Sequence, residues 1–385
     1  MNDTVLVNST TSSLGEAVID LGAIAHNTEV LAGMTEAGVL AVVKADGFGH
    51  GLIQVAETTL AHGATWLGVT SLAEAYELRA AGITAPVLSW MHLPDEDFGP
   101  AILADIDLSV SSAVHLAAIA AGAREIGRPA NVHLKLDTGL SRNGSAPPGW
   151  ADLIAKVRAC EQAGTIRVAG LWSHLASSEI PGDPSVAAQM RLFEEGVALV
   201  RAAGLDPWLL HLANSAAIVD LPATHYDLVR AGVGLYGVEP IEGRDHGLRL
   251  AMTLRSRTIM VKRVPAGTGV SYEHRYVTGA ETTLALVPLG FADGVPRLLS
   301  NRGEVVVAGT RCLIAGRVAM DQFLADAGDA IVDIGAEVIL FGPGDHGEPT
   351  VAEWAEWADT NAHEILTGIG ARVPRRYLPV HDGTE

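Results

Sequence analysis

Short apolar runs recur through the first two-thirds of the chain, and Ala- and Leu-rich segments separate them. Runs of this length that end in turn residues are typical of buried strands, and several of the segments between them end at Gly, as helices do. We expect strands at Val39–Val43, Trp66–Val69, Pro86–Ser89, Ile106–Val110, Asn131–Leu136, Val168–Trp172, Trp208–Leu212 and Asp227–Val229. We expect helices at Leu72–Ala81, Ala113–Ile126, Trp150–Ala163 and Ser185–Ala203. Eight strands that alternate with helices over about 200 residues favour an α/β fold, a (β/α)8 TIM-like barrel.

The pattern changes after about residue 239, where short strand-like runs follow one another with turn residues between them. They predict a mostly β second domain, with strands at Thr258–Val264, Thr283–Pro288, Glu304–Ala308, Arg311–Gly316 and Glu337–Phe341. We expect a flexible tail at 1–13, a barrel at 14–245 and a mostly β domain at 246–385. We also expect an early strand at Glu16–Asp20. The spacing of the runs does not identify its partner strand, which could belong to the second domain. A doubly wound sheet would show G-x-G-x-x-G after its first strand, and none is there.

Composition excludes several classes of partner. The 385 residues carry a formal net charge of -19, whereas a nucleic-acid backbone or an anionic membrane requires a basic face. The two cysteines, Cys160 and Cys312, do not make a disulfide framework and suit a reducing compartment. No apolar stretch approaches the roughly 18 residues of a membrane helix, and Met1–Ser13 lacks the basic and apolar regions of a secretory signal. We expect a cytoplasmic globular protein.

A lysine, Lys44, closes the first barrel strand and opens the glycine-studded turn Lys44–Gly51. It lies at the carboxyl end of its strand, where barrels of this type keep their active sites. A partly desolvated lysine there can lose its proton and form a Schiff base with a carbonyl cofactor such as pyridoxal phosphate. The alternative for this residue alone is a surface lysine with a solvated head.

Polar residues follow several other strands at the same rim, and they are Arg142, His174, Asn214 with Ser215, and Arg230. Each has a plain structural interpretation, such as a loop ion pair, a core histidine or a helix cap, but their common position favours a site. The loops His211–Ala217 and Arg230–Gly237 combine small residues with a helix start, which suits phosphate. Phosphate loops and a strand-end lysine together indicate pyridoxal phosphate, and we expect no metal site.

The fifth strand alternates apolar residues with His133, Lys135 and Asp137. This period of two directs His133 and Lys135 into the barrel. A buried ammonium is costly unless it is paired or neutralised, so Lys135 requires a nearby anion or a covalent change.

Taken together, these residues resemble the alanine racemase family of fold-type III pyridoxal-phosphate enzymes. The resemblance extends over nearly the whole chain, through Ala41–Gly51, Lys135–Gly144, Ser173–Ala176, His211–Ala217, Arg230–Gly237, Gly269–Tyr272, Gly290–Gly294, Gly316–Gln322 and Arg372–Arg375. Several ordered motifs at the family's spacing are far more specific than any one of them.

The resemblance implies a catalytic role for five residues. Lys44 is similar to the Schiff-base lysine that acts as a base on one face of the α-carbon, and Tyr272 to the base on the opposite face, contributed by the other subunit of a homodimer. Two opposed bases are what stereoinversion requires. Arg230 matches the arginine that faces the pyridine nitrogen and keeps it unprotonated, and His174 matches the residue that orients this arginine. Arg142 matches the group near the phenolic oxygen of the cofactor and the substrate carboxylate.

The same resemblance implies binding positions. Lys135 matches a lysine that is carbamylated in many members, which would answer its burial. The phosphate-binding positions are Ser215, Gly232 and Val233, with Asn214 beside them, and the positions at the substrate carboxylate are Met320 and Asp321.

Five positions depart from the family pattern. Tyrosine is usual at the cofactor-binding position Phe48, where its hydroxyl reaches the phosphate, and also at Phe291. Cysteine is usual at Ala319, glycine at Glu273, and many members carry a tyrosine at Ala371. The pocket wall has therefore lost hydroxyl groups and volume.

The leading hypothesis is an alanine racemase that supplies D-alanine for peptidoglycan. The closest alternative is a racemase of another or broader set of amino acids, such as serine or lysine, because of the altered wall. A non-catalytic pyridoxal-phosphate-binding protein is disfavoured by Tyr272 and the long β domain. A fold-type III decarboxylase would carry a glycine-rich phosphate loop and a C-terminal Cys-Asp pair, which the sequence lacks.

Overall fold

The computed structural model describes residues 13–380, so the predicted flexible tail lies outside the described residues except for Ser13. The chain divides into two compact units. One spans Asp20–Ala251 and is called the barrel unit below. The other contains Met252–Leu378 together with the N-terminal strand and is called the β unit. None of the helices described between residues 13 and 380 combines the length and the hydropathy that crossing a membrane requires.

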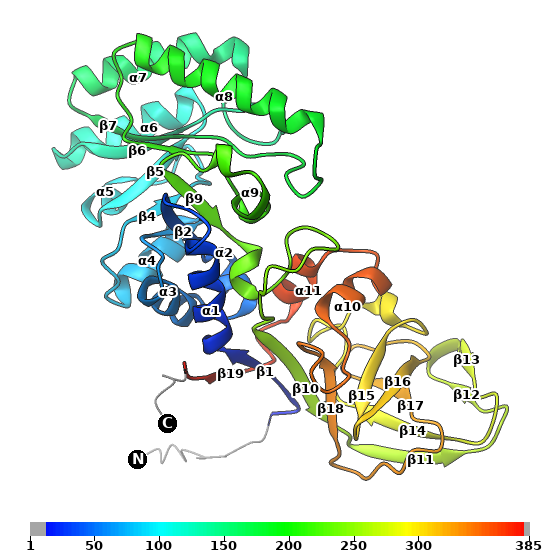
Figure 1. The fold of residues 1–385 in the computed structure, drawn as a ribbon. Coiled ribbons are helices and arrows are strands. Elements are labelled where there is room, and N and C mark those ends of the chain that lie inside the picture. Colours follow the sequence, from blue (N-terminus) through cyan, green and yellow to red (C-terminus); the bar gives the residue numbers. More distant parts are fainter. Residues whose placement is uncertain (1–12, 381–385) are drawn as a thin grey trace, which may run out of the picture. The chain divides into compact units, whose positions relative to one another are not determined.

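The barrel unit is built on eight parallel strands in the order β8-β7-β6-β5-β4-β3-β2-β9 (Figure 1). They are β2 (Gly38–Val42), β3 (Trp66–Val69), β4 (Val87–Ser89), β5 (Ile106–Val110), β6 (Ala130–Lys135), β7 (Ile166–Trp172), β8 (Leu209–His211) and β9 (Leu228–Ala231). Between the two end strands, the Asp227 amide donates to the Leu210 carbonyl (3.1 Å) and the Arg230 amide to the Ala213 carbonyl (3.0 Å). The barrel is therefore nearly closed, and the predicted fold class is confirmed.

Helices surround these strands in the barrel unit, as Figure 1 shows. They are α1 (Leu21–Ala32), α3 (Leu52–Ala61), α4 (Leu72–Ala80), α5 (Gly99–Leu103), α6 (Ala113–Ile126), α7 (Trp150–Gln162), α8 (Pro184–Ala202) and the short α9 (Ser215–Asp220). Local sequence explains their ends: Ser71 and Glu74 form a capping box at the start of α4, and Gly127 ends α6 at φ 70°. The segments therefore carry their own start and stop signals.

The β unit contains a nine-stranded sheet in the order β11-β14-β17-β16-β15-β18-β10-β1-β19. Its strands are β1 (Gly15–Asp20), β10 (Met252–Arg257), β11 (Met260–Val264), β14 (Thr282–Val287), β15 (Glu304–Val307), β16 (Thr310–Ala315), β17 (Phe323–Asp326), β18 (Glu337–Phe341) and β19 (Arg375–Leu378). Strand β1 pairs antiparallel with β10, from Gly15 opposite Ser256 to Ile19 opposite Met252. The early strand therefore belongs to this sheet.

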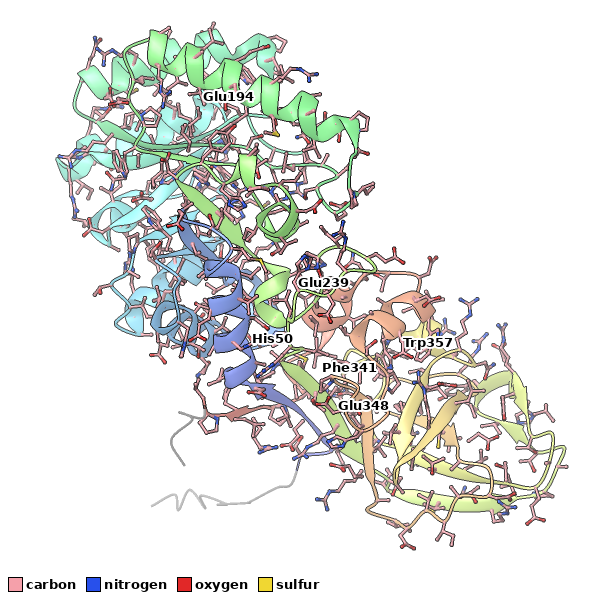
Figure 2. The ribbon with its side chains drawn as sticks, in the orientation of Figure 1. His50, Glu194, Glu239, Phe341, Glu348 and Trp357 are labelled. Carbon is pink, nitrogen blue, oxygen red and sulfur yellow. The ribbon has the colours of Figure 1, made fainter. Side chains whose placement is uncertain are left out.

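Two helices, α10 (Val351–Trp357) and α11 (Ala362–Gly368), accompany the sheet. Phe341 at the end of β18 packs edge-on against Trp354 of α10, with ring centroids 5.2 Å apart, and both side chains are fully buried. Figure 2 labels Phe341 in this unit. Aromatic pairs of this geometry stabilise a core beyond the area that they bury.

Candidate active site

A left-handed turn directly follows Lys44 at the carboxyl end of β2. Residues Ala45 to Phe48 have φ values of 54°, 54°, 58° and 53°, so the helical segment α2 (Lys44–Gly49) is wound in the opposite sense to an ordinary α-helix. This conformation costs L-residues about 1–2 kcal/mol each, and only Gly47 escapes the cost. Backbone strain of this kind persists where surrounding contacts impose it, and it concentrates at functional sites.

Hydrogen bonds on both sides hold the turn in place. The Ala45 amide donates to Glu74 Oε1 (2.7 Å), and the Leu52 amide donates to Asp46 Oδ1 (2.8 Å). The ring of His50, which Figure 2 labels, is fully buried with its Nδ1 2.9 Å from the Phe48 carbonyl oxygen. The contacts leave the Lys44 amine on a fixed backbone.

Three cationic side chains, those of Lys135, Arg142 and Arg230, and one histidine, His174, gather with Lys44. Burial and the charge of Arg142 lower the pKa of Lys44. Burial, Arg230 and Arg142 lower the pKa of Lys135 to about 7. Burial and the neighbouring cations, Arg230 first, hold the pKa of His174 well below its ordinary value, so this imidazole is neutral. Neighbouring cations contribute to the lowered pKa of Lys44, Lys135 and His174 because positive charge is in excess here, and an anionic ligand would relieve this repulsion.

Trp172, the last residue of β7, forms a platform beneath two of these cations. Lys135 Nζ lies 4.0 Å from the centre of its ring, and the guanidinium carbon of Arg230 lies 5.0 Å away. The ring of His211 stacks on it at 5.4 Å with an interplanar angle of 8°. The aromatic face stabilises cations that burial would otherwise penalise.

Contacts on both sides fix the orientation of Arg230. Its Nη2 donates to the carbonyl oxygens of Ser173 (2.8 Å) and Leu212 (3.0 Å) and to Nδ1 of His174 (3.1 Å). Its Nη1 lies 3.4 Å from Nδ1 of His211. Burial lowers the pKa of Arg230 to about 9, which leaves the side chain charged at neutral pH. The arginine is therefore a fixed, charged donor.

The two predicted phosphate loops meet at Ser215. Its hydroxyl oxygen accepts hydrogen bonds from the amides of Gly232 (2.8 Å) and Gly234 (3.3 Å). Asn214 caps α9 by accepting from the Ala217 amide (3.1 Å). A Cβ on Gly232 would lie 3.9 Å from Cζ of Phe48, the atom that bears the hydroxyl in a tyrosine. The position where a tyrosine would carry its hydroxyl therefore lies beside Gly232, and a contact with phosphate there stays a prediction.

A closed loop presents Arg142 after β6. Oδ1 of Asp137 accepts from the amides of Gly139 (2.9 Å) and Ser141 (3.1 Å). Gly144, at φ 116°, allows the chain to return, because a Cβ there would lie 2.8 Å from the Asp137 amide nitrogen. Arg142 is exposed at the end of this loop, yet its charge acts on Lys44, Lys135 and His174.

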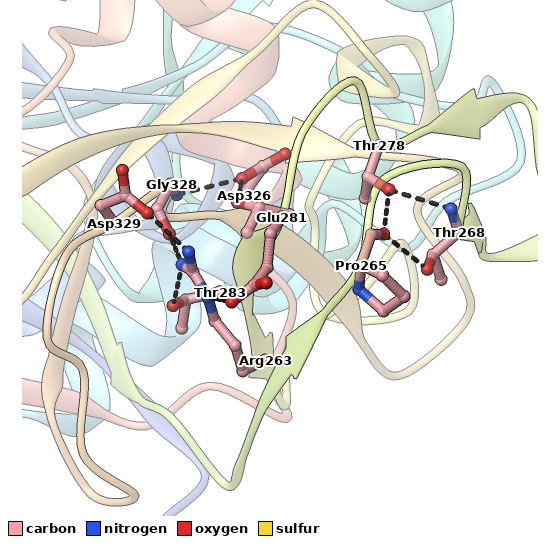
Figure 3. Close-up of polar contacts among 10 residues, drawn as sticks. Arg263, Pro265, Thr268, Thr278, Glu281, Thr283, Asp326, Gly328 and Asp329 are labelled. Atoms are coloured by element: carbon pink, nitrogen blue, oxygen red, sulfur yellow. Dashed lines mark hydrogen bonds and ion pairs between the residues drawn. The ribbon is translucent and has the colours of Figure 1, made fainter.

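In the β unit, Tyr272 lies on a hairpin between β12 (Gly269–Val270) and β13 (Tyr276–Val277), and 67% of it is exposed. The base of the hairpin is closed by Thr278, whose hydroxyl accepts from the Thr268 amide (2.9 Å) and donates to the Pro265 carbonyl (2.8 Å), as Figure 3 shows. The hairpin thus presents the tyrosine from a fixed base.

The residues on both sides of Tyr272 have positive φ, with 61° at Ser271 and 61° at Glu273. Glycine adopts this conformation without penalty, which gives a physical reason for the family's preference at Glu273. Here the Glu273 carboxylate pairs with Arg317 (2.8 Å) and Arg275 (2.9 Å). These ion pairs oppose the backbone cost at an exposed position.

The remaining candidates of the β unit lie on three loops, which follow β14, β16 and α11. The Phe291 amide donates to the Ala319 carbonyl (3.0 Å), and 44% of Phe291 and 56% of Met320 are exposed. Asp321 Oδ1 accepts from Arg372 Nη1 (2.8 Å), the residue after Ala371. Phe291, Ala319 and Ala371 are therefore linked to Met320 and Asp321 through these contacts and chain neighbours.

Comparison with known proteins decides the family. The family profile for the alanine racemase N-terminal domain matches residues 19–240, and that for the alanine racemase C-terminal domain matches residues 251–377. The chain belongs to the alanine racemase family. An alanine racemase of Frankia casuarinae is 52% identical over 369 residues, with 94% of this chain and 96% of the relative covered. One of Thermobifida fusca is 50% identical, with 95% and 98% covered.

Solved structures of alanine racemases are similar over nearly their full length. The enzyme of the D-cycloserine-producing Streptomyces lavendulae matches with a TM-score of 0.94 at 46% identity, covering 96% of this chain and 98% of that chain. The Bacillus anthracis enzyme with bound L-Ala-P matches with a TM-score of 0.87 at 31% identity, covering 98% and 97%. The predicted family and enzyme class, an isomerase, are confirmed.

The structure brings the predicted site residues of the barrel unit together, and their individual roles stay predictions, as do those of Tyr272, Met320 and Asp321. Asp107, Trp172 and His211 were not among the residues predicted for the site. Two signals were present: polar Asp107 and Ser109 share the inward face of a predicted strand, and His211 opens a motif that the family resemblance already contained. Trp172, at the end of an apolar run, carried no signal of its own.

Proposed function

We propose that the protein is an alanine racemase that uses pyridoxal phosphate to interconvert L-alanine and D-alanine. The observation that carries this proposal is the partly buried Lys44 amine, set on a strained turn among Arg142, Lys135 and Arg230 in a member of this family. Two smaller proposals follow from composition and family. The reaction takes place in the cytoplasm, and its D-alanine is used for peptidoglycan.

The residues of the barrel unit fit the cofactor. The excess of positive charge suits a phosphate and a phenolic oxygen, and the Ser215–Gly232 cradle has small residues where a phosphate would approach the backbone. Lys44 would hold the cofactor through its amine, and Arg230 would face the ring nitrogen with a donor that cannot accept a proton. Phe48 offers the phosphate an apolar edge in place of a hydroxyl.

When bound, pyridoxal phosphate supplies an aldehyde that captures the substrate amine and a ring that takes up the electrons left as the α-carbon loses its proton. The pKa of Lys44, lowered by burial and then by Arg142, favours the neutral amine, which is the form that can take up a proton from the α-carbon on one face. Tyr272 would move a proton on the opposite face. Arg142 would bind the substrate carboxylate, together with Met320 and the end of the loop at Asp321.

We include a homodimer with shared sites in the proposal. Tyr272 is largely exposed in a single chain and lies on a hairpin with a fixed base, as expected of a side chain that serves a second copy. Lys44 and Tyr272 would then belong to different subunits at each site.

Carbamylation of Lys135 is a further part of the proposal. Its pKa of about 7 makes a neutral amine available to bond to the carbon of carbon dioxide. One amine proton would be released to solvent, and the product would be a carbamate anion beside Arg142 and Arg230. The carbamate would attract the two arginines, whereas the Lys135 ammonium repels them.

The test is purified protein incubated with pyridoxal phosphate and either L- or D-alanine in D₂O. Enantiomers have equal free energies in an achiral solvent, so both reactions should approach a 1:1 mixture with deuterium at the α-carbon. If prolonged incubation of L-alanine yields no D-alanine, the proposal is wrong. Serine, lysine and arginine in parallel test whether the wall at Phe291, Ala319 and Ala371 admits larger substrates, and equal or faster turnover of any of them would favour the broader racemase.

Mixing two inactive variants tests the shared site. Lys44→Ala removes the amine and Tyr272→Phe removes the opposing base, so each homodimer is expected to be inactive. Exchange of subunits should restore one working site in each heterodimer. Subunit exchange shown by mass spectrometry, without any return of activity, would argue against the shared site.

A further inference from the structure

Four buried polar side chains inside the barrel are connected in series. Asp107 Oδ2 lies 3.1 Å from His133 Nε2, and His133 Nδ1 lies 2.9 Å from His211 Nε2. His211 Nδ1 lies 3.4 Å from Arg230 Nη1. Both histidines are fully buried, and Arg230 and Asp107 are 4% and 6% exposed. The series therefore runs from a carboxylate to a guanidinium without access to bulk water.

The chemistry of the two ends allows one arrangement of protons. A guanidinium only donates, so Nδ1 of His211 must accept and its Nε2 must carry the hydrogen. That hydrogen points to Nδ1 of His133, which leaves the His133 hydrogen on Nε2, directed at the Asp107 carboxylate. If both histidines instead carried their hydrogen on Nδ1, the His211 hydrogen would face a hydrogen of Arg230. The lone pair of His133 Nε2 would then face the Asp107 carboxylate. Burial and then the neighbouring His133 and Arg230 also hold the pKa of His211 well below its ordinary value.

The middle strand makes room for the histidine pair. His133 is on β6 and His211 is on β8, and β7 lies between them with Gly170 beside His133. A Cβ on Gly170 would lie only 2.2 Å from His133 Nδ1. The register of β6 and β7 shifts between Val132 and His133, which brings the glycine to this place. The sheet is thus shaped around the His133 ring.

Further contacts hold both rings. Trp172 stacks on His211, and Trp66 packs edge-on against His133 with centroids 5.6 Å apart. At the far end, Asn131 Nδ2 donates to Oδ1 of Asp107 (3.1 Å), which leaves Oδ2 for His133. Neither ring can turn over without losing a partner.

We propose that Asp107, His133 and His211 form a proton-ordered relay that presents an accepting nitrogen to Arg230 and so positions this arginine at the cofactor ring. The relay rests on the proposed function only for the place of the cofactor. The three are positioning residues, because they act through Arg230. The carboxylate sets the tautomer of His133, which sets that of His211, and neutral rings avoid a second buried cation beside Arg230.

The first experiment reads the protons directly. Holoenzyme labelled with ¹⁵N in its 14 histidines is studied by NMR at neutral pH, with His133→Asn as the variant that assigns the His133 signals and His62→Gln, at a partly exposed position, as the control. The expected result is Nε2–H tautomers for both His133 and His211. A hydrogen on Nδ1 of either ring, or a doubly protonated His133, would overturn the relay. This readout does not depend on racemase activity, so a protein that makes no D-alanine refutes the proposed function alone.

The second experiment separates positioning from packing. His133→Leu should lower kcat per bound cofactor about tenfold with KM for alanine unchanged, because a buried donor on His211 loses its acceptor. His133→Asn keeps an oxygen near the place of Nδ1 and should recover most of this loss. Equal losses in both variants, or no loss in His133→Leu, would overturn the proposal.

A double-mutant cycle tests the end of the relay. Asp107→Asn should lower kcat in the unaltered background and have no further effect when His133→Leu has already broken the path. Additive losses would show that Asp107 acts by another route and would remove it from the relay.

Discussion

The most informative single substitution in this barrel is Gly170→Ala. The new Cβ would lie 2.2 Å from Nδ1 of His133 and 2.8 Å from two carbons of the same ring. The φ angle of Gly170 is outside the positive range, so alanine fits the backbone itself. Any loss of stability must therefore come from the collision with His133.

The size of the effect follows from these contacts. Ordinary carbon contacts need about 3.5 Å, so the ring must move by about 1 Å. Overpacking in a dense core costs about 1–3 kcal/mol. Losing one of the two hydrogen bonds of His133, at 2.9 and 3.1 Å, adds about 0.5–3 kcal/mol, depending on whether the charged partner is lost. Alanine regains about 0.5–1 kcal/mol in a strand. We expect a net loss of about 2–4 kcal/mol.

Thermal unfolding of the cofactor-loaded protein measures this loss. A decrease in Tm of about 5–15 °C is expected for a unit of this size. The matched control is Gly279→Ala, where nothing lies within 4 Å of the new Cβ and φ is outside the positive range. This control should leave Tm within about 2 °C of the unaltered protein.

The refutation comes from a second site. In a His133→Ala background the ring is gone, so Gly170→Ala should cost nothing further and should be slightly stabilising. If the double variant instead loses the full sum of the two single losses, the collision with His133 is not the cause. The account of how β7 accommodates the relay would then be wrong.

Three further predictions concern strain and charge at the site. Ala45→Gly should raise stability by up to about 1 kcal/mol in thermal melts, because Ala45 is exposed and left-handed, whereas a loss would contradict the strain argument. Burial, with Arg230 as the second cause, lowers the pKa of Lys135 from 10.5 to about 7. In CO₂-free buffer, at a pH between these two pKa values, the unfolded chain binds more protons at Lys135 than the folded chain does. The urea midpoint of unfolding should therefore rise with pH in this range, and the rise should be smaller in Lys135→Met. Glu273→Gly should melt above Glu273→Ala, because both lose the ion pairs but only glycine relieves the positive φ.

The barrel strands could be predicted because each is a short apolar run bounded by turn residues. All eight predicted runs overlap observed strands, although β7 begins at Ile166, two residues before the predicted start. Ile166 is in the strand because it pairs with Ala130, and such pairing cannot be predicted from the apolar run alone. Strands β10, β17 and β19 were missed for the same reason. Strand β10 reads Met-Thr-Leu-Arg-Ser-Arg, and it becomes a strand by pairing with β1 and β18.

Site residues could be predicted where the residue type and its place at a strand end indicate the chemistry. They were harder to predict where the contact depends on how several strands are aligned. Lys44 and Arg230 could be placed from strand ends, and the inward position of His133 followed from its alternation. That His133 reaches His211 across an intervening strand depends on Gly170, whose role appears only when three strands are aligned. The left-handed turn is similar, because Ala45 and Phe48 adopt a conformation that neither residue type favours.

Backbone strain gives an independent reason to assign the chemistry to Lys44, Tyr272 and Arg142. Twelve non-glycine residues between 13 and 380 have positive φ. Seven of them lie within four residues of one of these three side chains, and they are Ala45, Asp46, Phe48, Ser141, Ser271, Glu273 and His274. Each such conformation costs about 1–3 kcal/mol, and strain of this kind is typical of positions that have a function. Both units thus hold these three side chains on backbones that local preference opposes. Hydrogen bonds that the Glu74 and Asp137 carboxylates accept, and one that the Thr278 hydroxyl donates, maintain these backbones.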